Sequence, residues 1–216
     1  MKNDWQLKSD VELELRWEPS VNAERIGVSV KDGVVELDGH VNSFYEKWAA
    51  ERAALRVSDV TAVACEIQVD VPASDGRTDE DIALTAANHL EWDYLVPPTV
   101  KVKVTDGRIT LSGKVEWQYQ KEEAERAVRY LKGVKSVFND IDVVPRVDAM
   151  QVKSKIEDAL KRNAEIDANR ITVQANGGEV TLSGSVRSWA EREEAEHTAW
   201  AAPGVTKVQD RIAIQF

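Results

Sequence analysis

The chain repeats one short motif three times, and this repetition limits the folds that it can adopt. The motif consists of two glycines separated by five residues, with a valine two positions after the second glycine. The copies occupy residues 33–41, 107–115 and 178–186, and their second glycines lie 74 and 71 residues apart. This near-equal spacing predicts three tandem copies of one structural unit.

The three repeats are predicted to span residues 1–72, 76–145 and 147–216. Short proline-containing segments at 72–76 and 145–148 separate them. A unit of about 70 residues buries only about 60% of the surface that its unfolded chain exposes, so it is marginally stable alone. We therefore expect neighbouring repeats to dock.

Each repeat is predicted to begin with a helix and a β-hairpin. The helix has apolar residues spaced by four, which places them on one face. In the three repeats these residues are Leu7, Val11 and Leu15; Ile82, Ala86 and Leu90; and Val152, Ile156 and Leu160. Alternating apolar residues then flank Asp32-Gly33, Asp106-Gly107 and Asn176-Gly177-Gly178, a pattern that predicts a hairpin.

A second helix and a last strand are predicted to complete each repeat. The helix has small residues on its apolar face, such as Ala53, Ala124 and Ala195, which predicts close packing on the sheet. The last strand follows a helical crossover and can pair in parallel with a hairpin strand. The predicted fold class is α+β: three tandem α-β-β-α-β units, each a small mixed three-stranded sheet with two helices packed on one face.

The motif glycines are predicted to shape this fold and not to bind phosphate. They are Gly33, Gly39, Gly107, Gly113, Gly178 and Gly184. The first of each pair lies in the hairpin turn, and the second lies in a strand, where a missing side chain usually marks a bulge or a close backbone approach. A phosphate-binding loop would need a Gly-Lys-Ser/Thr ending at a strand-to-helix turn, and none is present.

Composition argues against several classes of function. The formal net charge is −10, and residues 1–72 alone hold 14 acidic and 8 basic side chains, which argues against nucleic-acid binding. Cys65 is the one cysteine, so no intrachain disulfide can form. No apolar signal region or membrane span of roughly 18–20 residues is visible. We expect a soluble, cytoplasmic protein as the sequence stands, or a periplasmic one if a signal was removed.

The repeats resemble the BON family (bacterial OsmY and nodulation domains). The α-β-β-α-β order and the paired glycines match, as do Gly133-Val134 and Gly204-Val205 at the start of the last strand; repeat one has Asp59-Val60 there. The resemblance covers almost the whole chain. It implies a phospholipid-binding or envelope-associated module without enzymatic activity, connected with envelope or osmotic stress.

No residues have the spacing of a catalytic or metal site. His40, His89 and His197 fall at different positions of the repeat, whereas a transition-metal site needs three or four converging ligands. Ser112 and Ser183 lie in Leu-Ser-Gly and not in a nucleophile elbow. The carboxylates lie in helical runs typical of solvated faces. We predict no enzymatic activity, no cofactor and no metal.

The candidate binding surface lies in repeat two. Some tryptophans stand where the other repeats have polar residues: Trp117 aligns with Ser43 and Ser188. Such aromatics dock neighbouring repeats, contact a partner or a bilayer interface, or belong to a small satellite core. The surface combines these aromatic residues with cations: Trp117, Tyr119, Lys121, Arg126, Arg129, Tyr130, Lys132 and Lys135. Each cation near an anionic surface contributes about 1 kcal/mol, although glutamates share the helix.

Two functions remain open from the sequence. The first is binding of phospholipid or membrane surfaces through this cluster, in which case changing Lys132 and Lys135 to glutamate should abolish binding to anionic lipid. The second is a protein-interaction or assembly module without lipid binding. In that case exposed tryptophans and edge strands pair with another protein or with a second copy.

Overall fold

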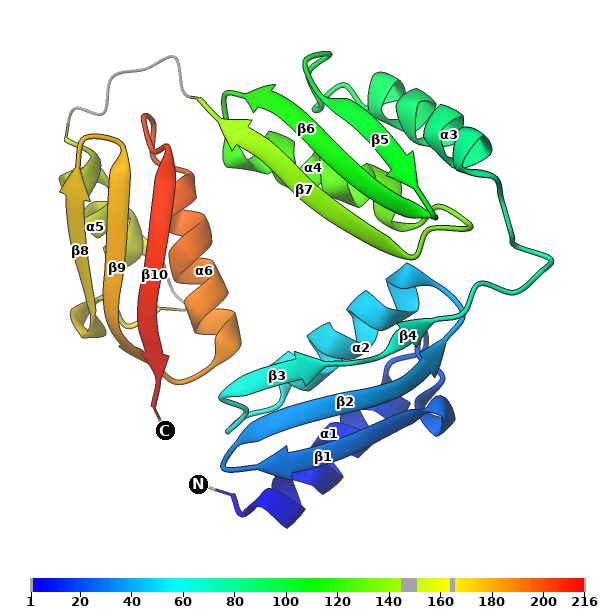
Figure 1. Cartoon of the computed structure of the whole chain (residues 1–216). Coiled ribbons are helices and arrows are strands. Elements are labelled where there is room, and N and C mark those ends of the chain that lie inside the picture. The colour runs from blue at the N-terminus through cyan, green and yellow to red at the C-terminus, as the bar shows by residue number, and fades with distance from the viewer. Residues whose placement is uncertain (1, 145–150, 164–165, 216) are drawn as a thin grey trace. The chain divides into compact units, whose positions relative to one another are not determined.

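The protein folds into three α+β repeats with the predicted order of elements (Figure 1). The computed structural model describes residues 2–144, 151–163 and 166–215, so the predicted linker at 145–148 lies outside them. The exact boundaries of the three repeats remain those predicted from the sequence. Below, repeats one, two and three are residues 1–72, 76–145 and 147–216.

The helices and strands occur in the same order in each repeat. Repeat one contains α1 (Asp4–Trp17), β1 (Ile26–Lys31), β2 (Val34–Val41), α2 (Phe44–Arg56), β3 (Ala62–Cys65) and β4 (Gln68–Val69). Repeat two contains α3 (Asp79–Trp92), β5 (Lys101–Thr105), β6 (Arg108–Val115), α4 (Gln118–Arg129) and β7 (Ser136–Val143). Repeat three contains α5 (Val152–Arg162), β8 (Ile171–Asn176), β9 (Glu179–Val186), α6 (Trp189–Trp200) and β10 (Lys207–Ile214). Short 3-10 helices, η1 (Ala23–Arg25) and η2 (Ala168–Arg170), precede β1 and β8.

The second hairpin strand is the centre of every sheet. The strand orders are β1-β2-β3, β5-β6-β7 and β10-β9-β8. The hairpins are antiparallel, and the last strand of repeats one and three runs parallel to the central strand, as predicted. The mixed sheet results because the last strand returns after a helix, and a helical crossover permits parallel pairing.

The last strand of repeat one differs from the prediction in being divided. β3 and β4 both pair with β2, with Leu37 opposite Cys65 and His40 opposite Gln68. The offset between partners is the same in both segments. The interruption is therefore local and does not change which side chains face the core.

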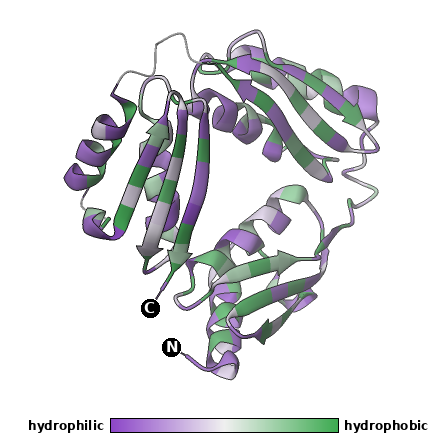
Figure 2. Cartoon of the chain, turned by 60° about the vertical axis from the view of Figure 1, so that its left-hand side comes forward, coloured by the Kyte–Doolittle hydropathy of each residue, from purple (hydrophilic) through white to green (hydrophobic). Residues whose placement is uncertain are grey.

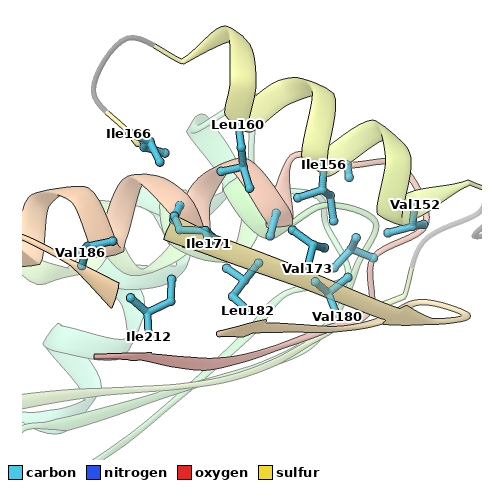
Figure 3. Packing of buried hydrophobic residues seen from close by; sticks show 14 residues of the cluster. Val152, Ile156, Leu160, Ile166, Ile171, Val173, Val180, Leu182, Val186 and Ile212 are labelled. Carbon is cyan, nitrogen blue, oxygen red and sulfur yellow. The ribbon is translucent and has the colours of Figure 1, made fainter. Parts of the chain in front are cut away.

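The predicted core positions are buried. The nine apolar residues predicted to lie on one face of α1, α3 and α5 are at most 6% exposed, and Ala53, Ala124 and Ala195 of the second helices are fully buried. Figure 3 shows α5 and α6 above the sheet of repeat three, with Ile156, Leu160 and Leu182 between these layers. Apolar and polar residues alternate along the strands (Figure 2), as expected when one face packs against helices.

Aspartates at the start of α1 and α3 hold the hairpin turns. The Asp4 carboxylate accepts hydrogen bonds from the backbone N–H groups of Asp32 and Gly33, at 3.0 and 3.3 Å. Asp79 accepts the same two bonds from Asp106 and Gly107, at 2.7 and 2.8 Å. The sequence predicts only a favourable interaction of Asp79 with the helix dipole. The structure adds a link between the first helix and the hairpin.

Candidate functional site

The predicted surface of repeat two lies on α4 and on the short segments before and after it. Ala124 and Val128 of α4 are buried in the core, whereas Tyr119, Glu122 and Arg126 are exposed. Tyr119 is 44% and Tyr130 is 57% exposed, and Trp117 is half-buried. The aromatic side chains of the predicted surface are thus partly accessible.

The cations of this surface are largely occupied by neighbouring groups. Lys121 Nζ donates a hydrogen bond to the carbonyl oxygen of Ile141 at 2.8 Å. Three ion pairs join Arg126 to Glu123, Arg129 to Glu125, and Lys132 to Asp75, at 2.7, 2.8 and 2.8 Å. Lys135 is exposed and forms no ion pair within the residues that the structure describes. An anionic ligand would therefore compete with carboxylates that already lie beside most of these cations.

Aromatic contacts occupy part of the same surface. The Arg129 guanidinium lies 4.0 Å from the ring centroid of Trp48, and the Tyr130 ring lies 4.6 Å from that of Tyr45. A cation over an aromatic ring is stabilised by the quadrupole of the ring. Tyr45 and Trp48 belong to α2, so these contacts support the docking role predicted for the tryptophans.

A second cationic surface lies between α5 and α6 in repeat three. Lys155 and Arg162 of α5 and His197 of α6 line a groove of about 470 Å³. Its apolar wall includes Ala159, Ala202 and Pro203. Lys155 and Arg162 form no ion pair within the described residues, whereas Lys153 and Lys161 on the same helix pair with Glu157 and Asp158.

The sequence alone does not identify this groove. One signal for it is the seven-residue spacing of Lys155 and Arg162, which places both on one helical face. The position of His197 on the other helix becomes evident only when α5 and α6 are packed together. The groove combines positive charge with an apolar wall, which suits a ligand that has an anionic and an apolar part.

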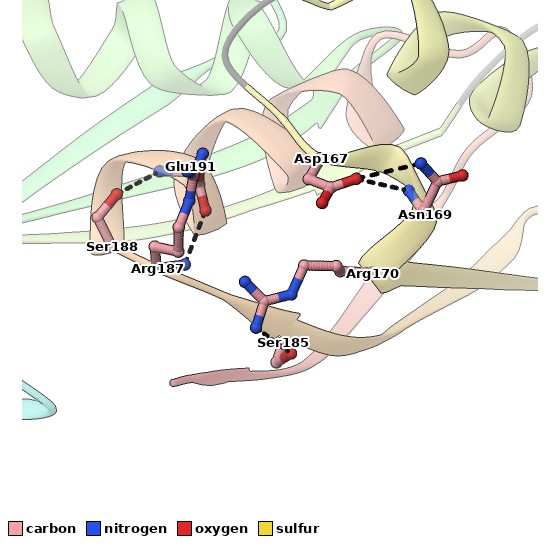
Figure 4. A network of polar contacts seen from close by, with 7 residues as sticks. All are labelled: Asp167, Asn169, Arg170, Ser185, Arg187, Ser188 and Glu191. Carbon is pink, nitrogen blue, oxygen red and sulfur yellow. Dashed lines mark hydrogen bonds and ion pairs between the residues drawn. The ribbon is translucent and has the colours of Figure 1, made fainter. Parts of the chain in front are cut away.

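Glu191 is buried, although the sequence places its charged run on a solvated face. It is 9% exposed, and Figure 4 shows it at the start of α6. One carboxylate oxygen accepts from the Arg187 backbone N–H at 2.7 Å, and the other accepts from the Arg187 guanidinium at 2.6 and 2.9 Å. Its own N–H donates to Ser188 Oγ at 3.2 Å. Glu191 thus fixes the turn between β9 and α6.

The contacts with Arg187 lower the pKa of the Glu191 carboxyl. Burial alone raises this pKa, but the hydrogen bonds and positive charge of Arg187 outweigh burial. Because the pKa is lower in the folded than in the unfolded chain, the stabilisation is complete above the ordinary glutamate pKa. It is lost as the pH falls through the folded-state value.

We predict that Glu191→Gln lowers the stability of repeat three at neutral pH by about 1–2 kcal/mol, because it removes charge-assisted hydrogen bonds. Gln120 occupies the equivalent position of repeat two, so the amide is sterically suited to the fold. The check is amide hydrogen exchange of α6 at neutral and acidic pH. The difference between variant and wild type should shrink below about pH 4; a difference independent of pH would contradict this role.

The other candidate groups, among the residues that the structure describes, do not assemble into a metal site. Within the described residues, no three His, Cys, Asp or Glu side chains are grouped to hold a metal ion. Burial raises the pKa of the Cys65 thiol, which disfavours the nucleophilic thiolate. None of the helices that the structure describes has the length and apolar character needed to cross a bilayer.

These features define the class of the protein: it consists of small tandem α+β domains with charged and apolar surfaces on their helices and at the edges of their sheets. The chain belongs to the BON domain family, which it matches over residues 3–71, 78–145 and 148–215. The resemblance seen in the sequence is thereby confirmed.

Two curated relatives match most of the chain. It is 32% identical over 145 residues to osmotically-inducible protein Y of Escherichia coli, covering 64% of this chain and 72% of that protein. It is 26% identical over 157 residues to the outer membrane lipoprotein DolP of Haemophilus influenzae, covering 68% and 80%. A solved domain of CdsD, a structural protein of the type III secretion system of Chlamydia trachomatis, is 15% identical with a TM-score of 0.28 and full coverage of both chains. That score is too low to support an argument.

Proposed function

We propose that this protein is a non-enzymatic BON protein that binds anionic phospholipid headgroups at the cell envelope. The observation that carries the proposal is the groove of repeat three, where Lys155, Arg162 and His197 meet an apolar wall. Lys155 and Arg162 form no ion pair with the described residues, so their charge is available to a ligand.

Electrostatics determines where such binding occurs. The chain has a formal net charge of −10, so a uniform charge distribution would be repelled by anionic lipid. Each lysine or arginine near the surface contributes about 1 kcal/mol and is screened by salt. Binding therefore requires cations separated from carboxylates. Lys155 and Arg162 of the α5–α6 groove meet this requirement better than the cations of α4, which are mostly paired; the Glu194 carboxylate, bound to the lining residue Asn163, is a carboxylate beside the groove.

The names of the relatives support an envelope and stress role. One is an osmotically inducible protein and the other is an outer membrane lipoprotein. We propose an envelope location for this chain on that basis, in place of the cytoplasmic expectation. Phospholipid is the proposed partner, and the proposed function requires neither a cofactor nor a metal.

The experiment is co-sedimentation with vesicles of phosphatidylglycerol or phosphatidylcholine, at low and physiological salt. Lys155→Glu with Arg162→Glu is expected to weaken binding to the anionic vesicles by at least about tenfold. The matched control is Lys153→Glu with Lys161→Glu, which makes the same charge change at paired positions of the same helix. The control should bind more tightly than the test variant.

A third variant tests the surface predicted in repeat two. Lys132→Glu with Lys135→Glu should have a smaller effect than the α5 test variant, because Lys132 is already paired with Asp75. If this variant alone loses binding, the site lies on α4 and not in repeat three. If wild-type protein binds neither vesicle, the lipid proposal is wrong.

A second candidate function is self-assembly or protein binding through exposed aromatic residues. Trp5, Trp17 and Leu13 of α1 are 76%, 83% and 57% exposed, and they lie on the side opposite its buried leucines. Concentration-dependent mass in light scattering would favour this function. A monomer at high concentration would count against self-assembly.

A further inference from the structure

The loop between the first helix and the hairpin is shorter in repeat two than in the other repeats. Val100 follows Leu90 by ten positions, whereas Ile26 follows Leu15 and Ile171 follows Leu160 by eleven positions. Repeats one and three form the 3-10 helices η1 and η2 in this loop. Repeat two has Pro97-Pro98 and no 3-10 helix there.

The shorter loop leaves a groove beside β5. The groove has a volume of about 750 Å³ and lies between α3, the proline-containing loop and the start of β5. Its lining is mainly apolar and includes Leu90, Val96, Pro97 and Val102, and the charged residues Glu91 and Lys101 also line it. Val102 is only half-buried, whereas the equivalent Val28 and Val173 are 7% and 1% exposed. Repeat two thus exposes core surface that the other repeats cover.

The same groove borders the outer edge of the sheet, which no other described strand covers. β5 is the outer strand of its sheet and has β6 as its sheet neighbour (Figure 1). The register pairs Thr105 with Arg108 across a two-residue turn. Because hydrogen-bonded and non-hydrogen-bonded pairs alternate, the N–H and C=O groups of Val102 and Val104 point away from β6. These groups can pair with an added strand.

The positive charges on β5 favour an added strand that carries acidic side chains. Lys101 and Lys103 are exposed and form no ion pair with any residue that the structure describes. A second β5 would place lysine beside lysine, which is unfavourable. Glutamate or aspartate on an incoming strand would instead lie beside these lysines, while the alternate side chains face the groove.

We propose that repeat two binds an extended peptide segment of alternating apolar and acidic side chains, added as a strand to β5. The apolar side chains enter the groove, and the carboxylates pair with Lys101 and Lys103. This site is separate from the proposed lipid site and does not depend on it, since it uses different residues of a different repeat.

The test uses a blocked hexapeptide of alternating valine and glutamate, titrated into the full chain and followed by amide NMR. We expect saturable shifts of the Val102 and Val104 amides, together with slower hydrogen exchange. The equivalent edge strand β8 provides an internal control, because its Val173 is buried and its loop forms η2. Absence of shifts in β5, or equal shifts in β8, would overturn the proposal.

Reversing the charge of the peptide or of β5 distinguishes specific pairing with Lys101 and Lys103 from non-specific binding of the peptide. A peptide of alternating valine and lysine should bind wild-type protein at least about tenfold more weakly, which corresponds to about 1.4 kcal/mol. Lys101→Glu with Lys103→Glu should reverse this preference, and both positions are exposed, so the fold should tolerate the change. An unchanged preference in the double variant would show that these lysines do not contact the peptide.

Discussion

Replacing Gly184 by alanine is expected to unfold repeat three or to destabilise it by about 3 kcal/mol or more. Gly184 has a φ of +125°, which side chains rarely adopt, and an added Cβ would overlap the carbonyl oxygen of Arg170. It would also lie 3.1 Å from the Arg170 carbonyl carbon, and these backbone atoms cannot rotate away as a side chain could. Gly39 and Gly113 make the same close approach to Arg25 and Thr99.

The matched control for this substitution is Gly177→Ala in the hairpin turn of the same repeat. Gly177 also has a positive φ, +58°, but no atom lies within 4 Å of the added Cβ. Gly177→Ala should therefore lower the free energy of unfolding by only about 1 kcal/mol, through backbone strain. Urea unfolding, followed by hydrogen exchange in β8 and β9, measures both variants. Equal effects would mean that the close approach to Arg170 does not determine the fold.

The second large effect is expected for Leu15→Ala, which should destabilise repeat one by about 2–5 kcal/mol. Leu15 is 1% exposed and packs with Leu7, Val11 and Leu37 in the core of that repeat. Truncation removes buried methyl groups and leaves a cavity that the surrounding helix and sheet cannot fully close. Hydrogen exchange of α1 and β2 would report the loss.

Leu13→Ala provides a control in the same helix. Leu13 is 57% exposed, so the same truncation should change the stability by no more than about 0.5 kcal/mol. A cost for Leu13→Ala equal to that for Leu15→Ala would mean that the exposed side of α1 is covered in solution. That result would favour the self-assembly function.

The core and the order of elements could be predicted from the sequence because both depend on local periodicity. Spacing by four identifies Leu7, Val11 and Leu15 as one face of α1, and alternation around Asp106-Gly107 identifies the β5–β6 hairpin. A helix places every fourth residue on one face, and a strand places every second residue on one face. Three copies of the pattern also determined the number of repeats and the family.

The candidate binding surfaces could be located only in the tertiary structure, because they depend on groups distant in sequence. Lys132 lies 57 residues from Asp75 in sequence, yet the two side chains form an ion pair with which an anionic lipid would compete. Lys155 and Arg162 share one face of α5, but only the packing of α6 brings His197 to the same groove. The groove beside β5 arises because one missing loop residue and two prolines replace a 3-10 helix that covers the core elsewhere. Ion pairing and covering of the core depend on distance in space, whereas periodicity reports only which face of an element a residue occupies.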